Sequence, residues 1–288
     1  MLVALALIWG ASFMFIKIAD RQLAPATLIF GRIGLAALAL AVAAPKGTIA
    51  TLRAHARWLV VVGLVNTAIP FWLLSWGETR IQSGLASIIQ AAVPIFNAAL
   101  AFLFFKELRV TGTRLVGVGV GFVGVALLVG AQPQGKVLGA LAVVGMAFCY
   151  GAGGLMASRH LREAPAHVVA LGTSTVAAIA AAPAGIIQAP HFVPSWKTFA
   201  SIAVLGIIGT AIAYLLFFAI IANAGSGYAS LVTYLVPPVA LAYGAIFLGE
   251  RFGATAFVAL AIILGGVALG TGGWRVLRTR RRPLPSEA

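Results

Sequence analysis

Residues 83–107 read SGLASIIQAAVPIFNAALAFLFFKE, and residues 226–250 read SGYASLVTYLVPPVALAYGAIFLGE. The two stretches align without a gap at an offset of 143, and nine of their 25 positions are identical. A chain of this composition would give about two or three identities by chance. The same offset places Thr67-Ala68-Ile69 on Thr210-Ala211-Ile212. This pattern predicts that the chain contains two copies of one unit.

The composition is that of a membrane protein. Hydrophobic residues make up 61% of the 288 positions and charged residues 9%, whereas roughly a quarter of a soluble domain is charged. This excludes an ordinary water-soluble protein and also a disordered chain, which needs low hydrophobicity. The net charge of +14 could indicate nucleic-acid binding. The cations, however, lie between long neutral runs or in the last fourteen residues, so we assign them to membrane topology and expect no nucleic-acid partner.

Long apolar runs occupy almost the whole chain. A helix rises about 1.5 Å per residue, so about 18 or more apolar residues cross about 30 Å of hydrocarbon. Ten stretches satisfy this condition: 2–19, 26–44, 58–77, 82–105, 113–131, 137–157, 165–187, 199–222, 227–248 and 254–273. The gaps between them leave no room for a soluble domain. The first stretch lacks a basic leading region, so we expect it to be a retained helix and not a signal peptide.

Lysine and arginine are enriched on the cytoplasmic side of membrane proteins. With the N-terminus in the cytoplasm, thirteen of these cations fall on the cytoplasmic side and six on the outer side, while Arg32 lies within a span. The even number of spans then places both termini in the cytoplasm. We predict a multi-pass protein of the bacterial inner membrane, with a basic cytoplasmic tail, residues 275–288, that attracts anionic lipid.

The repeat divides the spans into two sets of five. Because five is an odd number, the second copy must enter the membrane upside down relative to the first. We therefore predict an all-α integral membrane protein with ten transmembrane helices, arranged as two inverted five-helix repeats around a central cavity. The first repeat covers residues 1–133 and the second covers residues 134–274. Inverted repeats of this kind are typical of alternating-access transporters.

At several of these residues the chain resembles the drug/metabolite transporter superfamily, specifically its ten-helix EamA-type members. The resemblance is carried by WGASFMFIK (9–17), by FGR (30–32) and by the Ser-Gly, Pro and Glu pattern shared by 83–107 and 226–250. It implies a substrate cavity between the two halves and export of amino acids or related metabolites, aromatic amino acids included.

Polar and aromatic residues within the spans are the candidate substrate-binding groups, because polar groups are costly in lipid and should face the protein interior or water. They come from three pairs of spans that match under the repeat, and these six spans are expected to line the cavity. The candidates are Trp9, Ser12, Thr67, Gln90, Asn97, Tyr150, Thr210, Tyr214, Thr233 and Tyr234. The alternative for each is packing between helices, and the Trp or Tyr side chains could also anchor at the membrane interface.

Pro94 and Pro237 lie at equivalent positions in the middle of two spans. Proline cannot donate the backbone hydrogen bond of a helix, so each is expected to kink its helix. The kinks are either static or a pair of symmetric hinges, and their presence in both copies favours hinges.

Arg32 lies about six residues inside span 26–44, where a cation is costly. It is expected to bind a substrate carboxylate, to pair with Asp20 or Glu78, or to extend outward to the surface.

Glu107 and Glu250 end two equivalent spans. Each is expected either to face the N-terminus of the following helix or to close a gate as a salt bridge with the arginine beside it, Arg109 or Arg251.

The acidic residues predict the energy coupling. The chain has six of them, and none lies in the middle of a span: Asp20, Glu78, Glu107, Glu163, Glu250 and Glu287. The histidines lie in or beside loops. Because proton-driven transporters usually carry such groups within the membrane, we expect export or exchange without a dedicated buried proton site. An uncharged, aromatic cavity suits small zwitterions, since aromatic faces stack on rings or lie over an ammonium group.

Other functions remain alternatives, namely an integral membrane enzyme or a channel. An enzyme of this kind tends to need clustered acids, histidines or a metal, and we find no such cluster, so we expect no catalytic residue, metal or cofactor. The single cysteine, Cys149, also excludes a disulfide within the chain. Glycine pairs in 117–121 and 266–270 are expected either to form a homodimer face or to pack helices within one chain.

Overall fold

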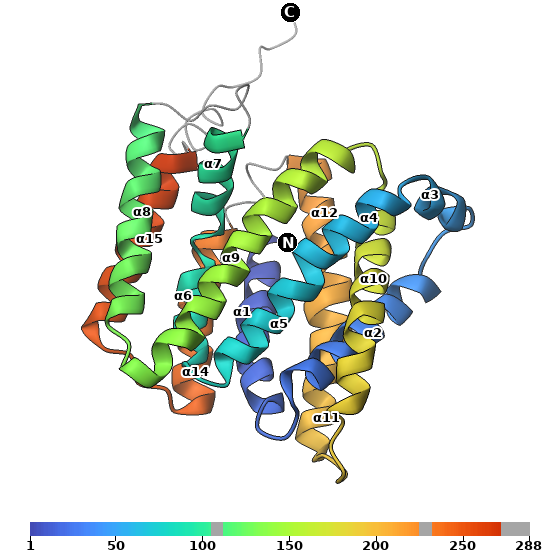
Figure 1. The fold of residues 1–288 in the computed structure, drawn as a ribbon, viewed down its shortest axis with the longest axis horizontal. Helices are drawn as coiled ribbons and strands as arrows, with labels where there is room; N and C mark the ends of the chain where they lie inside the picture. Colours follow the sequence, from blue (N-terminus) through green and yellow to red (C-terminus); the bar gives the residue numbers. More distant parts are fainter. Residues whose placement is uncertain (105–111, 225–231, 272–288) are drawn as a thin grey trace, which may run out of the picture.

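The fold is known from a computed structural model, which describes residues 1–104, 112–224 and 232–271. These residues form helices joined by short turns, and no strand occurs among them. The helices stand side by side and run between the two ends of the molecule (Figure 1). The predicted all-α class is thus confirmed for the described part of the chain.

The helices follow the predicted apolar stretches. In chain order they are α1 (Leu2–Ala19), α2 (Pro25–Val42), α3 (Thr48–Ala54), α4 (Ala56–Gly63), the π-helix η1 (Leu64–Ala68), α5 (Ile69–Glu78), α6 (Ser83–Gln90), α7 (Val93–Phe104), α8 (Thr113–Gly130), α9 (Gln134–His160), α10 (Ala166–Ile187), α11 (Trp196–Ala203), the π-helix η3 (Val204–Ile212), α12 (Ala213–Ala224), α14 (Val232–Leu248) and α15 (Ala254–Thr271).

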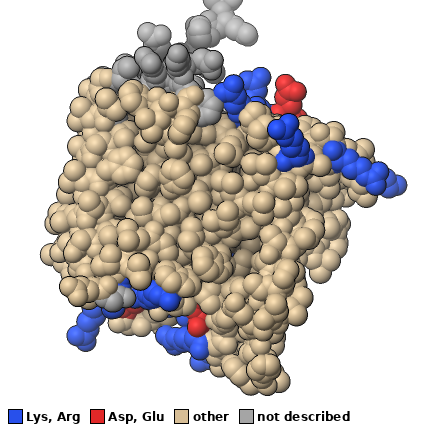
Figure 2. All heavy atoms as spheres, in the orientation of Figure 1, with Lys and Arg blue, Asp and Glu red and all other residues tan. Residues whose placement is uncertain are grey.

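Length and polarity make this a membrane protein. Within the described ranges, seven helical segments are long and apolar enough to cross a bilayer, and three shorter apolar helices cover Leu115–Gly130, Val232–Leu248 and Ala254–Gly270. Charged side chains gather at two opposite ends of the face shown in Figure 2, and a broad uncharged band lies between them. Such a band suits hydrocarbon, where charges are costly. The exact number of spans and the inverted repeat remain predictions.

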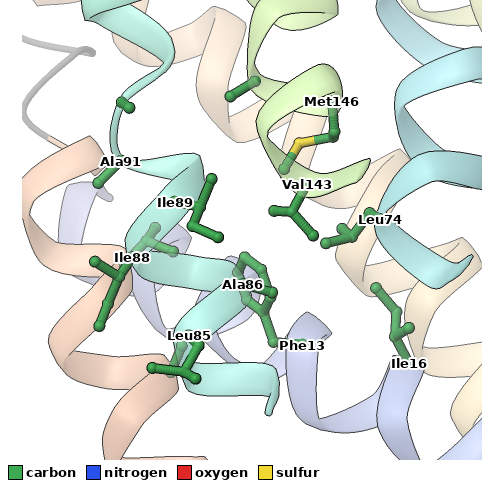
Figure 3. Packing of buried hydrophobic residues seen from close by; sticks show 14 of the residues in the cluster. Phe13, Ile16, Leu74, Leu85, Ala86, Ile88, Ile89, Ala91, Val143 and Met146 are labelled. Carbon is green, nitrogen blue, oxygen red and sulfur yellow. The ribbon is translucent and has the colours of Figure 1, made fainter. Parts of the chain in front are cut away.

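The apolar core lies where α1, α5, α6 and α9 meet. Figure 3 shows Phe13 of α1 beside Ala86 of α6, with Leu74 of α5 and Val143 of α9 near them. These side chains are buried. The core fixes the ends of α1, α5 and α6 next to one another.

Two continuous helical spans change from α-helix to π-helix in the middle. The segment η1 interrupts the span that begins with α4, and η3 interrupts the span that begins with α11. Each segment holds one threonine with 0% of its surface exposed, Thr67 in η1 and Thr210 in η3. The hydroxyl of Thr210 donates a hydrogen bond to the carbonyl oxygen of Leu205, 2.8 Å away. A π-turn widens the helix and is frequent at functional sites.

The two predicted proline kinks differ in the structure. The span that contains Pro94 is broken, because α6 ends at Gln90 and α7 begins at Val93. Pro94 has no N–H to donate to the carbonyl of Gln90, which explains the break. The helix α14 continues through Pro237. The hinge role of both prolines stays a prediction.

Glycines pack α8 directly against α15. A side chain added at Gly117 would lie 2.3 Å from the backbone nitrogen of Gly270, and one added at Gly266 would lie 2.5 Å from the nitrogen of Gly121. The two glycine pairs therefore serve packing within one chain, the second of the two alternatives. The possible homodimer then has no surface assigned to it.

Gly266→Ala should destabilise the protein, because the new methyl group would press on the backbone of α8. Overpacking of this kind costs about 1–3 kcal/mol, so we expect the unfolding temperature in detergent to fall by a few degrees. Gly265 is the matched control, since nothing lies within 4 Å of a side chain added there. Equal stability of Gly266→Ala and Gly265→Ala would contradict this packing.

Candidate functional site

Arg32 lies at the centre of a buried group of side chains that comes from several helices. Only 6% of its surface is exposed. Its Nε donates a hydrogen bond to Thr210 Oγ1 at 3.1 Å, and its guanidinium carbon lies 4.2 Å from the centre of the Phe71 ring. Tyr150 and Tyr214 lie close enough for their hydroxyls to interact with the arginine charge. We call these five residues the Arg32 cluster.

The Arg32 cluster brings together residues from the two predicted halves. Arg32 is on α2 and Phe71 on α5, whereas Thr210 belongs to η3 and Tyr214 to α12. The hydrogen bond between Arg32 and Thr210 spans 178 residues of sequence. The predicted extension of Arg32 to the surface is wrong, because this hydrogen bond and the Phe71 ring hold the side chain in the interior.

The chemistry of the Arg32 cluster suits a carboxylate. Among the described residues, the guanidinium makes its hydrogen bond through Nε, not to Asp20 or Glu78 as one alternative held. Its two terminal nitrogens can therefore form the paired hydrogen bonds that arginine makes with carboxylates. The rings of Phe71 and Tyr150, whose centres lie 6.4 Å apart in an edge-to-face arrangement, supply an apolar wall beside that charge.

Four of the predicted binding residues lie in or against the Arg32 cluster, namely Thr67, Tyr150, Thr210 and Tyr214; Thr67 lies beside Tyr214. Two more are close by on α1. Ser12 donates to the carbonyl of Ile8 at 3.1 Å and lies against Gly209, the neighbour of Thr210. The ring of Trp9 lies 5.4 Å from that of Phe217 on α12.

The remaining predicted residues lie on α6, α7 and α14. Asn97 donates from Nδ2 to the carbonyl oxygen of Gly151 at 3.3 Å, so its amide serves the packing of α7 on α9. Gln90, Thr233 and Tyr234 are half-buried on α6 and α14, two helices that contact each other and α1. The prediction that six spans line the cavity omitted α2, which supplies Arg32. Arg32 is a cation inside a span, and this was the sequence signal that could have added α2 to the helices of the site.

Glu250 joins the two predicted halves at one end of the molecule. Its Oε1 accepts a hydrogen bond from the backbone N–H of Ser83 at 2.7 Å, and its Oε2 accepts from Ser83 Oγ at 2.9 Å and from the N–H of Gly84 at 3.2 Å. A carboxylate satisfies the free N–H groups at the start of a helix, here α6. We call Glu250, Ser83 and Gly84 the Glu250 clasp.

The Glu250 clasp corrects both alternatives for this residue. Glu250 caps a helix of the other half, not the following helix α15, and the described contacts of its carboxylate are not with Arg251. The chain can turn back because Gly249 has φ +67°, a conformation that glycine adopts without strain. The equivalent residue Glu107 lies outside the described residues.

Three charged residues meet beside the clasp, at the ends of α1 and α5. Lys17 is half-buried, and its ammonium donates to the carbonyl oxygens of Glu78 and Ile81, the latter at 2.7 Å. Asp20 Oδ1 accepts a hydrogen bond from Ser75 Oγ at 2.8 Å. Glu78 has 0% of its surface exposed. We call Lys17, Asp20 and Glu78 the Glu78 cluster.

The expectation that no acid is buried is therefore wrong for Glu78. The residue ends its helix, as predicted, but its neighbours cover it. Gly77 allows α9 to approach α5 closely, with the carbonyl oxygen of Gly139 2.9 Å from where a side chain on Gly77 would begin. Burial also raises the pKa of Asp20 to about 7, although the hydrogen bond from Ser75 and the charge of Lys17 act in the opposite direction.

Comparison with known proteins points to transport. The sequence model of the EamA-like transporter family matches residues 1–130 and 137–271. A protein of Streptantibioticus cattleyicolor named "Probable terminal-alkyne amino-acid exporter" is 29% identical, over 93% of this chain and 91% of its own. A protein of Salmonella typhimurium named "Probable amino-acid metabolite efflux pump" is 25% identical, over 95% and 94%.

Two further similarities concern the location and the fold. An Escherichia coli protein named "Uncharacterized inner membrane transporter YedA" is 26% identical, over 94% of this chain and 89% of its own. A protein of known crystal structure superposes with a TM-score of 0.62 at 19% identity, over 97% of this chain and 98% of that one. The second likeness shows that the two share a fold.

Asp20→Asn should flatten the dependence of stability on pH. The unfolded chain releases this proton near the ordinary value of 3.8 and the folded protein near 7, so between these values the folded state binds more protons. Stability is then full below the lower value and falls as pH rises through the higher one. We expect the unfolding temperature of the wild type to fall by a few degrees across this window, and that of Asp20→Asn to fall less.

The exposed acid Glu163 is the control for this measurement. Glu163→Gln removes one carboxylate from the opposite end of the molecule and should keep the wild-type slope. If Asp20→Asn also keeps the wild-type slope, the burial of Asp20 does not have the assigned effect.

Proposed function

The chain belongs to the EamA-like transporter family, and from this premise we propose that it exports neutral amino acids and related zwitterionic metabolites, aromatic ones included. It is a multi-pass transporter of metabolites in the inner membrane, as its family, its apolar helices and its relatives indicate. The observation that carries the proposed substrate is the Arg32 cluster: a buried guanidinium, against an aromatic ring, at the boundary between the two halves.

Each part of a zwitterion has a complementary group in or near this cluster. The terminal nitrogens of Arg32 would bind the carboxylate. The rings of Phe71, Tyr150 and Tyr214 would contact an apolar or aromatic side chain, and an aromatic face also attracts an ammonium group. Two of the similar proteins are named as an exporter and an efflux pump for amino acids or their metabolites, which supports the same substrate class.

Transport would proceed by alternating access between two inverted five-helix halves with ten spans in total. Several observations support this arrangement. The family model matches two stretches that adjoin the predicted boundary at 133–134. Thr67 and Thr210, which the repeat aligns, both lie in π-helical segments and are both fully buried. The Glu250 clasp joins one half to the other and would have to open when this end opens.

The proposed orientation of the chain in the membrane rests on the distribution of lysine and arginine. With more cations on the cytoplasmic side, both termini lie in the cytoplasm and the Glu250 clasp lies at the outer face. The structure then corresponds to a state that is closed toward the outside. Family membership favours a transporter over the membrane enzyme and over the channel.

Counterflow in proteoliposomes tests the proposal. Vesicles loaded with unlabelled amino acids should take up labelled L-phenylalanine, or other neutral amino acids in a panel, when they contain the purified protein. Failure of every amino acid in the panel to exchange would contradict the proposed substrate class.

Arg32→Gln should raise the concentration of L-phenylalanine needed to inhibit this exchange by about tenfold to a hundredfold, because a hydrogen bond to a charged group is worth about 1.5–3 kcal/mol. Inhibition by phenylethylamine, which has the same ring and amine but no carboxylate, should change little. The exposed Arg21→Gln is the matched control and should behave as the wild type. An equal loss for both compounds would show that Arg32 does not bind the carboxylate.

A further inference from the structure

Glu78 is a buried acid without a hydrogen-bond partner. Its surface is 0% exposed, and neither carboxylate oxygen has a partner among the described residues. An ionised carboxylate in such surroundings would have neither water nor donors to stabilise it. At the end of α5 the backbone carbonyls of Glu78 and, just beyond the helix, Ile81 accept from the ammonium of Lys17.

The charges that face Glu78 come from three directions. Lys17 and Asp20 lie on α1, Arg32 lies on α2, and Glu250 lies in the segment after α14. The cations are both engaged elsewhere: the ammonium of Lys17 donates to backbone carbonyls, and Arg32 donates to Thr210.

Among the described residues, the other groups packed at this end of α5 include uncharged ones on α9 and α6. The helix α9 meets this end of α5 through Gly139 and Val143, which contact Gly77. The helix α6 begins here with Ser83, whose hydroxyl donates to Glu250. Figure 3 shows apolar side chains of the same helices, with Phe13 of α1 beside Ala86 of α6.

The balance of these charges calls for one proton. Three carboxylates (Asp20, Glu78 and Glu250) act on one another here, together with two cations, Lys17 and the more weakly interacting Arg32. If all five were ionised, the group would carry one net negative charge, and a single proton would neutralise it. Glu78 is the one whose two oxygens are both buried and unpartnered, so the proton is best placed there.

We propose that Glu78 is a proton-binding site and that its proton holds this end of the bundle closed. In the closed state the neutral carboxyl group lies beside Asp20 and Glu250 without repelling them, and the Glu250 clasp stays formed. When this end opens, water reaches Glu78 and accepts the proton. The resulting carboxylate then repels Glu250 and opposes return to Ser83 until a proton from water binds again.

This inference rests on the proposed function in one respect, which is that the end closed by the Glu250 clasp is a face through which substrate passes. Because the closed state binds the proton more tightly than the open state, a proton must favour closure by the same factor. A pH difference across the membrane would then bias the direction of transport. The site replaces the sequence-based expectation of a transporter without a buried proton group.

The accessibility of a cysteine at Ala86 tests the site. Ala86 is 0% exposed and packs beside Phe13 of α1, one turn beyond Ser83 in α6, so we expect a maleimide to reach it only when opening of the clasp separates α6 from α1. The background is Cys149→Ser, which removes the native cysteine, and the full chain is labelled in detergent over a series of pH values. Labelling at exposed position 80, in Arg80→Cys, corrects for the pH dependence of the reagent itself.

With Glu78 present, corrected labelling of Ala86→Cys should rise by about fivefold or more from acidic to alkaline pH, as expected for a coupling of this kind. With Glu78→Gln, which resembles the protonated acid, labelling should stay at its low level at every pH. Glu163→Gln is the matched control and should keep the wild-type profile. A rising profile in Glu78→Gln, or a flat one in the wild type, would overturn the proposal.

Two further measurements protect this test against a folding defect. Asp20→Asn removes one repelling carboxylate, so the midpoint of the labelling profile should move to lower pH while Glu78 itself is retained. Infrared difference spectra should show a protonated carboxyl band in the wild type that is absent in Glu78→Gln; its presence in both would contradict the assignment.

No substrate enters these measurements, so their failure can be told apart from failure of the exporter. Flat labelling together with working amino-acid counterflow would remove the proton site and leave the exporter. Labelling that depends on pH and on Glu78, together with no amino-acid counterflow, would keep the proton site and remove the proposed exporter.

Discussion

A hydrocarbon solvent offers no hydrogen bond and no counter-charge, so every polar group within the membrane must find its partner inside the protein. For the backbone this requirement selects helices, and the described residues contain no other regular structure. For side chains it requires that distant parts of the chain meet. Arg32 finds Thr210 across 178 residues, and Glu250 finds Ser83 across 167.

The same requirement connects the fold with transport. The hydrogen bond of Arg32 and those of the Glu250 clasp both join residues of the first predicted half to residues of the second. Contacts between two halves can be exchanged when the halves move, whereas contacts within a half would move with it. Under the proposed alternating access, the polar groups that stabilise the closed state would be the ones that the cycle has to release. The proposed proton site at Glu78, which is buried, would add a group whose charge changes when these contacts change.

The sequence was sufficient for those features that depend on local patterns. Runs of apolar residues predicted the helices, and Pro94 predicted a kink where the structure has a break between α6 and α7. The aligned threonines were recognised as a pair, and both proved to be buried in π-helical segments. Three-dimensional neighbours could not be predicted in this way. Glu78 ends a helix in the sequence, and only the packing of α1, α6 and α9 around it makes it buried.

Arg32 and Asn97 show the same limit for the site. Both are polar residues within apolar helices, and periodicity alone treats them alike. In the structure Asn97 bonds to the backbone of a neighbouring helix, while Arg32 lies among aromatic rings from three other helices, α5, α9 and α12. Long-range contacts decide which of two such residues packs helices together and which can bind a ligand. A single sequence carries no direct signal for these contacts.

The central claim is that the two halves are inverted copies that meet at these polar contacts. Single cysteines placed at positions 107 and 250, which the repeat aligns, test it most directly when a membrane-impermeant reagent is applied to intact cells and to inverted vesicles. The account predicts that position 250 reacts from the outside and position 107 from the cytoplasmic side. Reaction of both from the same side of the membrane would contradict it.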